Sequence, residues 1–206
     1  AGRAFYDKGN LEKLPSIFDK LNQQAQRAGA VLERVQTMTT QGDREKEILQ
    51  CRTLIEEVVK LAESEARIRD INISVTFYDS KAQVYTDRVQ IQQVLLNLLR
   101  NGMEAMQATG LENGNTIEVL SSVLDNKHLH ISVIDTGSGL DPKVAQKLFT
   151  PFNSTKKNGM GIGLSISKSI IQSHGGSIDY TKNKPTGSIF SFTLPIVTKN
   201  LHELTT

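Results

Sequence analysis

The sequence has little or none of several features that mark particular classes of protein. Only one of its 206 residues is a cysteine, Cys51, so no disulfide can form within the chain. The formal net charge is +2, which provides no basic field for nucleic acid. No apolar run approaches the roughly 18 residues of a membrane span, and no signal peptide is visible. We therefore expect no nucleic-acid partner and no membrane contact by this chain.

Two common phosphate-binding patterns are also missing. There is no G-x-x-x-x-G-K-[ST], and no G-x-G-x-x-G follows a predicted strand. The remaining composition, with 38% apolar and 22% charged residues, suits one or two soluble globular domains with a core. The chain begins AGRAFYDKGN, without a methionine, so we expect it to be a fragment of a longer protein.

The first part of the chain carries a heptad pattern. Its apolar residues are alternately three and four positions apart: Leu11, Leu14, Phe18, Leu21, Ala25, Ala28, Leu32 and Val35. This spacing predicts a long helix that packs against other helices. The partner is either another part of this chain or a second copy. Because the sequence has no second heptad, self-association is favoured.

After a helix-ending stretch at Thr39–Asp43, the pattern changes to a mixture of helices and strands. Apolar periodicity predicts helices at about 52–68, 87–107, 142–148 and 162–174. Alternation predicts strands at 71–77, 83–85, 116–123 and 128–134, followed by a hairpin formed by SIDYT and SIFSFTLP. Because the two types do not alternate regularly, we expect an α+β fold. The expected fold is a two-layer sandwich of a mixed, mostly antiparallel sheet with helices on one face, preceded by the long helix.

The stretch from Asp135 to Leu164 is rich in glycine and follows an apolar run. Glycines allow close backbone approach, and a glycine turn that leads into a helix presents free N–H groups to an anion. A lysine nearby, Lys156, adds positive charge. These features indicate a nucleotide phosphate site under a mobile loop. Glycine-rich loops are also common as plain turns, so this stretch alone leaves both interpretations open.

The predicted helix at 87–107 carries two asparagines, Asn97 and Asn101, four positions apart on one face. Such amides need partners, because a buried polar group without one costs about 1–3 kcal/mol. They either hydrogen-bond a neighbouring helix or provide oxygen ligands for Mg²⁺ beside phosphates. The pattern by itself allows both.

Four motifs in order carry a family resemblance. QQVLLNLLRNGMEAM resembles the N box of the GHKL ATP-binding fold, DTGSGL the first glycine box, FTPF the F box and GMGIGLSIS the second glycine box. Together they cover about residues 48–196 and resemble sensor histidine kinases in particular. The resemblance implies ATP and Mg²⁺ as cofactors. It also implies transfer of the ATP γ-phosphoryl group to a protein histidine.

The resemblance also implies roles for individual residues. Asn101 matches the Mg²⁺-binding asparagine, and Asn97 faces the metal and phosphates one turn earlier. Asp135 matches the aspartate that accepts a hydrogen bond from the adenine amino group. Further matches are Gly137 and Gly139 beside the base and ribose, Phe149 and Phe152 as lid anchors, Gly159, Gly161, Gly163 and Leu164 on the phosphate side, and Lys156 reaching the phosphates.

Two positions depart from the family pattern. Gly102 stands where alanine is usual, which costs helix stability but leaves the site intact. Asn97 stands where the hydrolysing branches have a glutamate that activates water, and an amide cannot act as a general base. This favours phosphoryl transfer over hydrolysis. The alternatives are a GHKL ATPase and a non-catalytic module that binds nucleotide or docks a partner.

None of the four histidines has the context of a phosphate acceptor, which the family places on a helix before an acidic residue within the dimerisation hairpin. They are His128, His130, His174 and His202. We therefore expect the acceptor on a preceding helix outside this chain. Residues 1–40 then resemble the second helix of that hairpin, 41–47 a linker, 48–197 the catalytic domain and 198–206 a tail.

The same resemblance implies partners and a location. The expected partners are a response regulator receiver domain, the histidine-bearing helix of the same kinase, and a second copy bound through residues 11–38. The expected location is the cytoplasm, with either a membrane-anchored or a soluble parent protein.

Overall fold

The structure is a computed structural model, and it describes residues 18, 24, 46–110, 114–153 and 161–197. Within the heptad region, only Phe18 and Gln24 fall inside these ranges, and both are helical. The rest of the predicted helix, the self-association segment at 11–38 and the tail at 198–206 lie outside the described residues. In the part that is described, no helix is long and apolar enough to cross a membrane.

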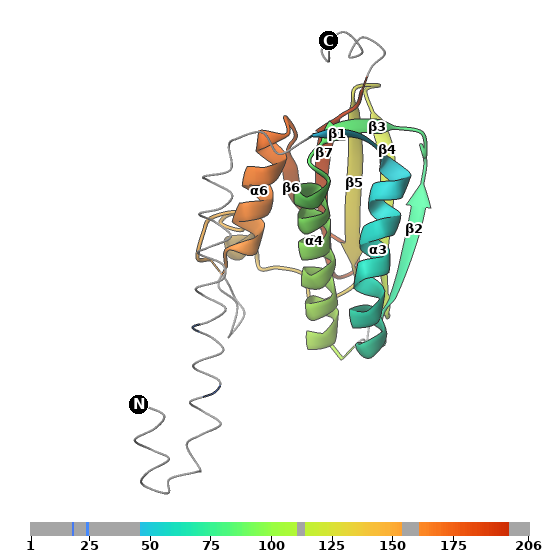
Figure 1. Cartoon of the computed structure of the whole chain (residues 1–206). Helices are drawn as coiled ribbons and strands as arrows, with labels where there is room; N and C mark the ends of the chain where they lie inside the picture. Colours follow the sequence, from blue (N-terminus) through green and yellow to red (C-terminus); the bar gives the residue numbers. More distant parts are fainter. Residues whose placement is uncertain (1–17, 19–23, 25–45, 111–113, 154–160, 198–206) are drawn as a thin grey trace, which may run out of the picture.

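A five-stranded sheet forms one layer of the described domain (Figure 1). Its strands are β2 (Asn72–Phe77), β4 (Thr116–Leu124), β5 (His128–Asp135), β6 (Ile178–Lys182) and β7 (Ser188–Pro195). The order across the sheet is β2-β4-β5-β7-β6. β2 and β4 pair in parallel, and the other neighbours are antiparallel. The mixed, mostly antiparallel sheet predicted from the sequence is therefore confirmed.

The strands bury alternate residues, as a sheet covered on one face requires. On β7, Phe190, Phe192 and Leu194 are buried, and the residues between them are only partly covered. β5 ends at the buried Asp135, which pairs with Ser188 at the start of β7. The antiparallel register thus places the last residue of one central strand beside the first residue of its neighbour.

Three helices cover one face of this sheet (Figure 1). They are α3 (Cys51–Ile68), α4 (Arg88–Ala108) and α6 (Gly163–Ser173). α4 lies between the other two and contacts both. The two-layer α+β arrangement is therefore confirmed.

α4 is a 21-residue helix with a clear start signal. The Asp87 carboxylate accepts a hydrogen bond from the Gln90 N–H at 3.0 Å and so caps the first turn. The buried side follows the predicted periodicity: Ile91, Val94, Leu95, Leu98, Leu99, Gly102, Met103 and Met106. This apolar stripe fixes the rotation of the helix, and with it the direction in which its two asparagines lie.

α5 (Pro142–Ala145) is shorter than the predicted helix at 142–148. Asp141 caps it, and Pro142 occupies the first turn. After Ala145 the hydrogen bonds connect residues three apart, from Lys147 N–H to the Val144 carbonyl and from Leu148 N–H to the Ala145 carbonyl. The chain therefore tightens into turns where the sequence suggests another helical turn.

A second, two-stranded sheet was not fully predicted. β1 (Glu47–Gln50) pairs antiparallel with β3 (Gln83–Thr86). Its sequence, EILQ, is too short for alternation to be recognised, and it begins in the segment expected to be a linker. The ladder places the buried Leu49 opposite the buried Val84.

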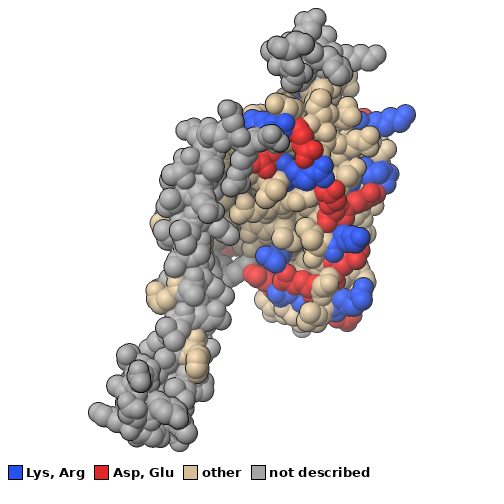
Figure 2. Space-filling model, in the orientation of Figure 1, with Lys and Arg blue, Asp and Glu red and all other residues tan. Residues whose placement is uncertain are grey.

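Charged side chains of both signs are interleaved on the face that carries α3 (Figure 2). Arg88, at the start of α4, bonds Glu47 of β1 at 2.8 Å and Glu57 of α3 at 2.7 Å. The Glu57 carboxylate also accepts from the Gln92 side chain at 2.7 Å. Exposed pairs of this kind stabilise a fold only modestly, but this group connects β1 to the first turn of α4.

Candidate active site

α4 carries the residues around which the candidate site is arranged. Asn97, Asn101 and Ala105 follow one side of the helix at four-residue spacing. This side meets α6 and the end of β5, both of which contact α4. The segments that the sequence analysis singled out thus come together on a single helix.

Asn97 meets the start of α6. Its side-chain Nδ2 donates a hydrogen bond to the Ser167 hydroxyl at 3.0 Å. A Cβ atom added at Gly163 would lie only 2.7 Å from Asn97 Oδ1. A side chain at position 163 would therefore displace the amide of Asn97 from its place, whereas glycine leaves room for it.

Asp135 is almost fully buried, with 2% of its surface exposed. Its Oδ1 accepts hydrogen bonds from the Gly137 N–H at 2.9 Å and the Ser188 N–H at 3.1 Å. Burial raises the pKa of the Asp135 carboxyl above its ordinary value, and these hydrogen bonds act in the opposite direction. The carboxyl group is thus held in one orientation by two main-chain donors.

The first glycine box packs tightly against α4. A Cβ at Gly137 would lie 2.7 Å from the carbonyl carbon of Ala105. A Cβ at Gly102 would lie 3.4 Å from the Cβ of Asp135. Gly139 has a φ of +68°, so it adopts a left-handed conformation that favours glycine. These glycines allow the end of β5 to approach the helix closely.

The turn between β6 and β7 also holds Asp135, which sequence reasoning missed. Asn183 Nδ2 donates to the Asp135 main-chain carbonyl at 2.9 Å. The Thr186 hydroxyl donates to the Thr136 carbonyl at 3.3 Å. Gly187 lies so close that an added Cβ would be 2.0 Å from the Asp135 carbonyl oxygen. The turn residues predict a hairpin, but no spacing signal shows that it folds onto a residue about fifty positions earlier.

The start of α6 is suited to binding an anion. The helix begins at Gly163, with no acidic residue in its first turn and no side-chain cap. The first N–H groups of a helix lack partners within it and favour negative charge. Gly161, just before the helix, has a φ of +65°, and an added Cβ would lie 2.5 Å from the Asn153 main chain. α6 also confirms the helix that the sequence predicts at 162–174, after the second glycine box.

The remaining predicted site residues differ in their surroundings. Phe149 packs against the core, and the Lys168 ammonium lies 5.6 Å from the centre of its ring. Phe152 is 71% exposed and has a φ of +65°. Leu164 is partly buried against the core. Lys156 and Gly159 lie outside the described residues, so their expected roles stay predictions.

The three described histidines lie on β5 or at the end of α6. His128 lies 3.1 Å from Asp125 in the turn that joins β4 and β5. His130 lies on β5, and burial lowers its pKa. His174 ends α6, where its Nε2 accepts from the Asp87 N–H at 3.2 Å, and burial also lowers its pKa. None of these three lies in a helix next to an acidic residue.

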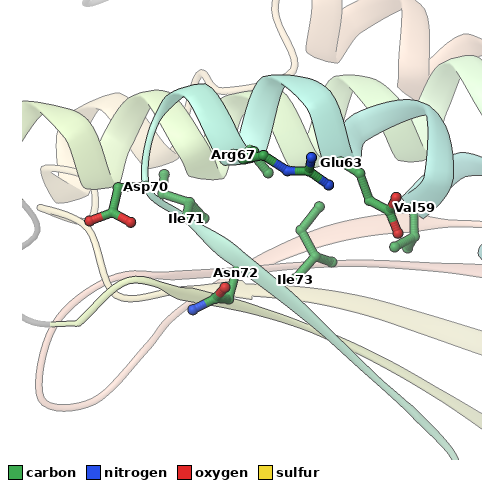
Figure 3. Close-up of a pocket in the computed structure, with 8 residues that line it drawn as sticks. Val59, Glu63, Arg67, Asp70, Ile71, Asn72 and Ile73 are labelled. Atoms are coloured by element: carbon green, nitrogen blue, oxygen red, sulfur yellow. The ribbon is translucent and has the colours of Figure 1, made fainter.

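A separate hollow lies between α3 and β2 (Figure 3). It is lined by side chains of α3, of the loop that follows and of the first residues of β2: Val59, Glu63, Ala66, Arg67, Asp70, Ile71, Asn72 and Ile73. None of them is a predicted site residue. This hollow is therefore not part of the candidate site on α4, β5 and α6.

Gly102 allows a direct test of how tightly α4 packs against Asp135. A Cβ there would lie 3.2 Å from Ile117 Cδ1, the flexible end of a buried side chain. Because this atom needs to move only slightly, we expect Gly102→Ala to stabilise the fold by about 1 kcal/mol through helix propensity. Urea unfolding measures this change, and the affinity for ATP should not change. If Gly102→Ala instead destabilised the fold by a similar amount, Ile117 would be shown to be unable to move.

The comparisons with known proteins agree with this arrangement. The sequence profile described as "Histidine kinase-, DNA gyrase B-, and HSP90-like ATPase" matches residues 86–198. The sensor protein FixL of Bradyrhizobium diazoefficiens is 38% identical over 191 residues, which is 93% of this chain but 37% of FixL. The chain thus spans little more than a third of this curated relative.

Solved structures give the same result. The catalytic domain of histidine kinase ThkA is 32% identical, with a TM-score of 0.64, and the match covers 73% of this chain and 95% of that domain. Histidine kinase ThkA in complex with the response regulator TrrA matches 91% of this chain and 52% of that chain, at 29% identity and a TM-score of 0.69.

Proposed function

This chain belongs to the family of histidine kinase-, DNA gyrase B- and HSP90-like ATPases, and from that membership we propose that it is the ATP-binding catalytic module of a sensor histidine kinase. The module transfers the γ-phosphoryl group of ATP to a histidine on a preceding helix. That histidine then passes the group to a response regulator. The domain runs over 48–197, after the linker at 41–47 and part of a dimerisation hairpin at 1–40.

The observation that carries this proposal is the meeting of three site segments on α4. Gly102 lies against Asp135, and Ala105 against Gly137, so the helix contacts the proposed adenine end of the site. Asn97 lies against Gly163, so the same helix contacts the proposed phosphate end. Asn101 is between these contacts along α4, where its side chain would hold Mg²⁺ beside the phosphates. Along α4, the proposed adenine end, metal position and phosphate end thus follow one another as adenine and the phosphates do in ATP.

The chain's own residues fit Mg²⁺ and ATP. Asn101 provides a hard side-chain oxygen, which Mg²⁺ accepts when phosphates and water complete its shell. Asp135 provides an acceptor for the adenine amino group, and the start of α6 provides main-chain donors for phosphates. When bound, Mg²⁺ neutralises charge that develops on the phosphoryl oxygens. The protein contributes positioning and fixed donors.

The identity of residue 97 supports transfer rather than hydrolysis. The Asn97 amide donates to Ser167 and has no group that can take a proton from water. A kinase instead needs to keep water from competing with the histidine. Lys156, Gly159, Phe149 and Phe152 belong to the proposed lid that closes over the phosphates.

The acceptor and the partners follow from the family. The three described histidines lack the required helix context, which supports an acceptor on another segment of the parent kinase. The solved complex of ThkA with its response regulator TrrA supports a response regulator as the partner. Self-association through residues 11–38 and a cytoplasmic location complete the proposal.

Phosphate transfer between two separate chains tests this function. The 206-residue chain is incubated with γ-labelled ATP and Mg²⁺, alone and with a peptide that carries the preceding histidine-containing helix. We expect no label on the chain alone and label on the peptide in the mixture. The bond should be labile in acid and stable in alkali, as a phosphorylated histidine is.

Other outcomes would support the alternatives. Steady phosphate release without the helix indicates an ATPase, and binding of a non-hydrolysable ATP analogue without any transfer indicates a non-catalytic module. No binding of the ATP analogue at millimolar concentration contradicts every one of these functions that needs nucleotide and leaves only a module that docks a partner. Strong labelling of the isolated chain would show that one of its own histidines is the acceptor, with His202 the first to test.

A further inference from the structure

Ser167, in the second turn of α6, bonds differently from the other described serines of that helix. Ser165, Ser169 and Ser173 donate their hydroxyl protons to α6 carbonyls three or four residues earlier. The Ser167 hydroxyl accepts a hydrogen bond from Asn97 Nδ2 on α4, at 3.0 Å. Ser167 is 2% exposed, so this contact is shielded from water. It connects two helices that both carry predicted site residues.

The Asn97 amide is enclosed from two directions. Gly163 and Ser167 are one turn apart on α6, so they share the face that meets α4. Oδ1 of the amide lies on the Gly163 side, as the 2.7 Å distance to an added Cβ shows. Nδ2 lies on the Ser167 side. Nδ2 lies 3.2 Å from the same added Cβ, so the whole amide is held against the first turn of α6, where we place the phosphates.

A serine hydroxyl can accept from an amide NH₂ group or donate to an amide oxygen, so its bond fixes where the Asn97 amide lies. An amide oxygen in this place can attract Mg²⁺ or the protons of its bound water. The position of the amide therefore matters for a site that holds a cation.

We propose that Ser167 is a positioning residue that holds the Asn97 amide beside the Mg²⁺–phosphate end of the site. This inference rests on the proposed function and adds a residue outside the assigned set. Ser167 acts by accepting from Nδ2, so its effect passes entirely through Asn97. It does not contact the adenine end, where Asp135 lies on a different strand.

Nucleotide binding to the 206-residue chain tests this role by titration calorimetry. Ser167→Ala should weaken binding of a non-hydrolysable ATP analogue with Mg²⁺ about fivefold to tenfold, the equivalent of one hydrogen bond. Binding of adenosine, which has no phosphate, should not change. Ser167→Thr keeps the hydroxyl and should restore the affinity. Thermal unfolding of each variant shows whether it is folded.

Ser165→Ala is the matched control. It makes the same change two residues earlier in α6, at a position that is 8% exposed, and its hydroxyl bonds only its own helix. We expect its affinity for the Mg²⁺–analogue complex to equal that of the unchanged chain. A difference between the two alanine variants then reports the contact with Asn97 and not the loss of a buried hydroxyl.

A double-mutant cycle separates positioning from a structural role. In an Asn97→Ala background, Ser167→Ala should cause no further loss of affinity, because the group that it orients is gone. The same loss in both backgrounds, an equal loss for adenosine, or an equal loss in Ser165→Ala would overturn the inference while leaving the proposed function intact. Absence of nucleotide binding by the unchanged chain would overturn both.

Discussion

Replacing Asp135 by asparagine should remove most of the affinity for ATP. The carboxylate accepts a hydrogen bond from the adenine amino group in the proposed complex, and a bond to a charged group contributes about 1.5–3 kcal/mol. We therefore expect ATP to bind about 100-fold more weakly, at about 1.4 kcal/mol for each factor of ten. A GTP analogue should lose no affinity, because its base has a carbonyl oxygen at the corresponding position. Titration calorimetry with both analogues measures the change.

The same substitution should stabilise the nucleotide-free fold at neutral pH. Burial raises the pKa of the Asp135 carboxyl above 3.8, its ordinary value, so the folded chain keeps this proton to a higher pH than the unfolded chain does. The stability that this provides is present below 3.8 and is lost as the pH rises through the raised value. Asparagine does not ionise and shows no such loss.

Urea unfolding across this pH range measures the effect. The free energy of unfolding of Asp135→Asn relative to the unchanged chain should grow as the pH rises above about 4, until the buried carboxyl group is fully ionised. The asparagine oxygen can still accept from the Gly137 and Ser188 N–H groups, so the packing is kept. Asp179→Asn, at an exposed position on β6, makes the same chemical change away from the site and serves as the control. A constant difference across the range would contradict the raised pKa of Asp135, and unchanged ATP affinity would contradict its assignment as the adenine acceptor.

Periodicity in the sequence was enough to predict most of the fold. The helix at 87–107 differs from α4 by one residue at each end, and the strand at 128–134 differs from β5 by one residue at its last position, because a long apolar stripe or a clear alternation fixes an element. β1 was missed since four residues carry too little pattern. The helix at 142–148 was predicted too long, because its last residues form turns that sequence pattern does not distinguish from a helix.

In the candidate site, too, some residues could be predicted from the sequence and others could not. Motifs identified Asn97, Asp135 and Gly163, and the structure brings Asn97 against Gly163 and Gly102 against Asp135. Asn183 and Ser167 were not identified, because their bonds join residues 48 and 70 positions apart. An asparagine in a turn and a serine in a helix are common, so only the folded arrangement shows that they hold site residues.

Replacing Asn101 by alanine should have the largest effect on catalysis. We propose that this side chain holds Mg²⁺, whose stabilisation of phosphoryl transfer amounts to several kcal/mol. A loss of about 3 kcal/mol lowers the rate about 100-fold or more. The initial rate of label transfer to the histidine-bearing helix measures it. Binding of adenosine should not change, because Asp135 lies at the other end of the site.

The role of Asn101 as a metal ligand is distinguished from a structural role by its response to Mg²⁺. In the unchanged chain, affinity for the ATP analogue should rise with Mg²⁺ concentration, whereas in Asn101→Ala it should barely respond. Asn101→Asp keeps an oxygen ligand of similar size and should keep the response, because carboxylates also bind Mg²⁺. If the alanine variant responds to Mg²⁺ as the unchanged chain does, another residue holds the metal. If the aspartate variant fails as completely as the alanine variant, the amide serves a purpose other than ligation.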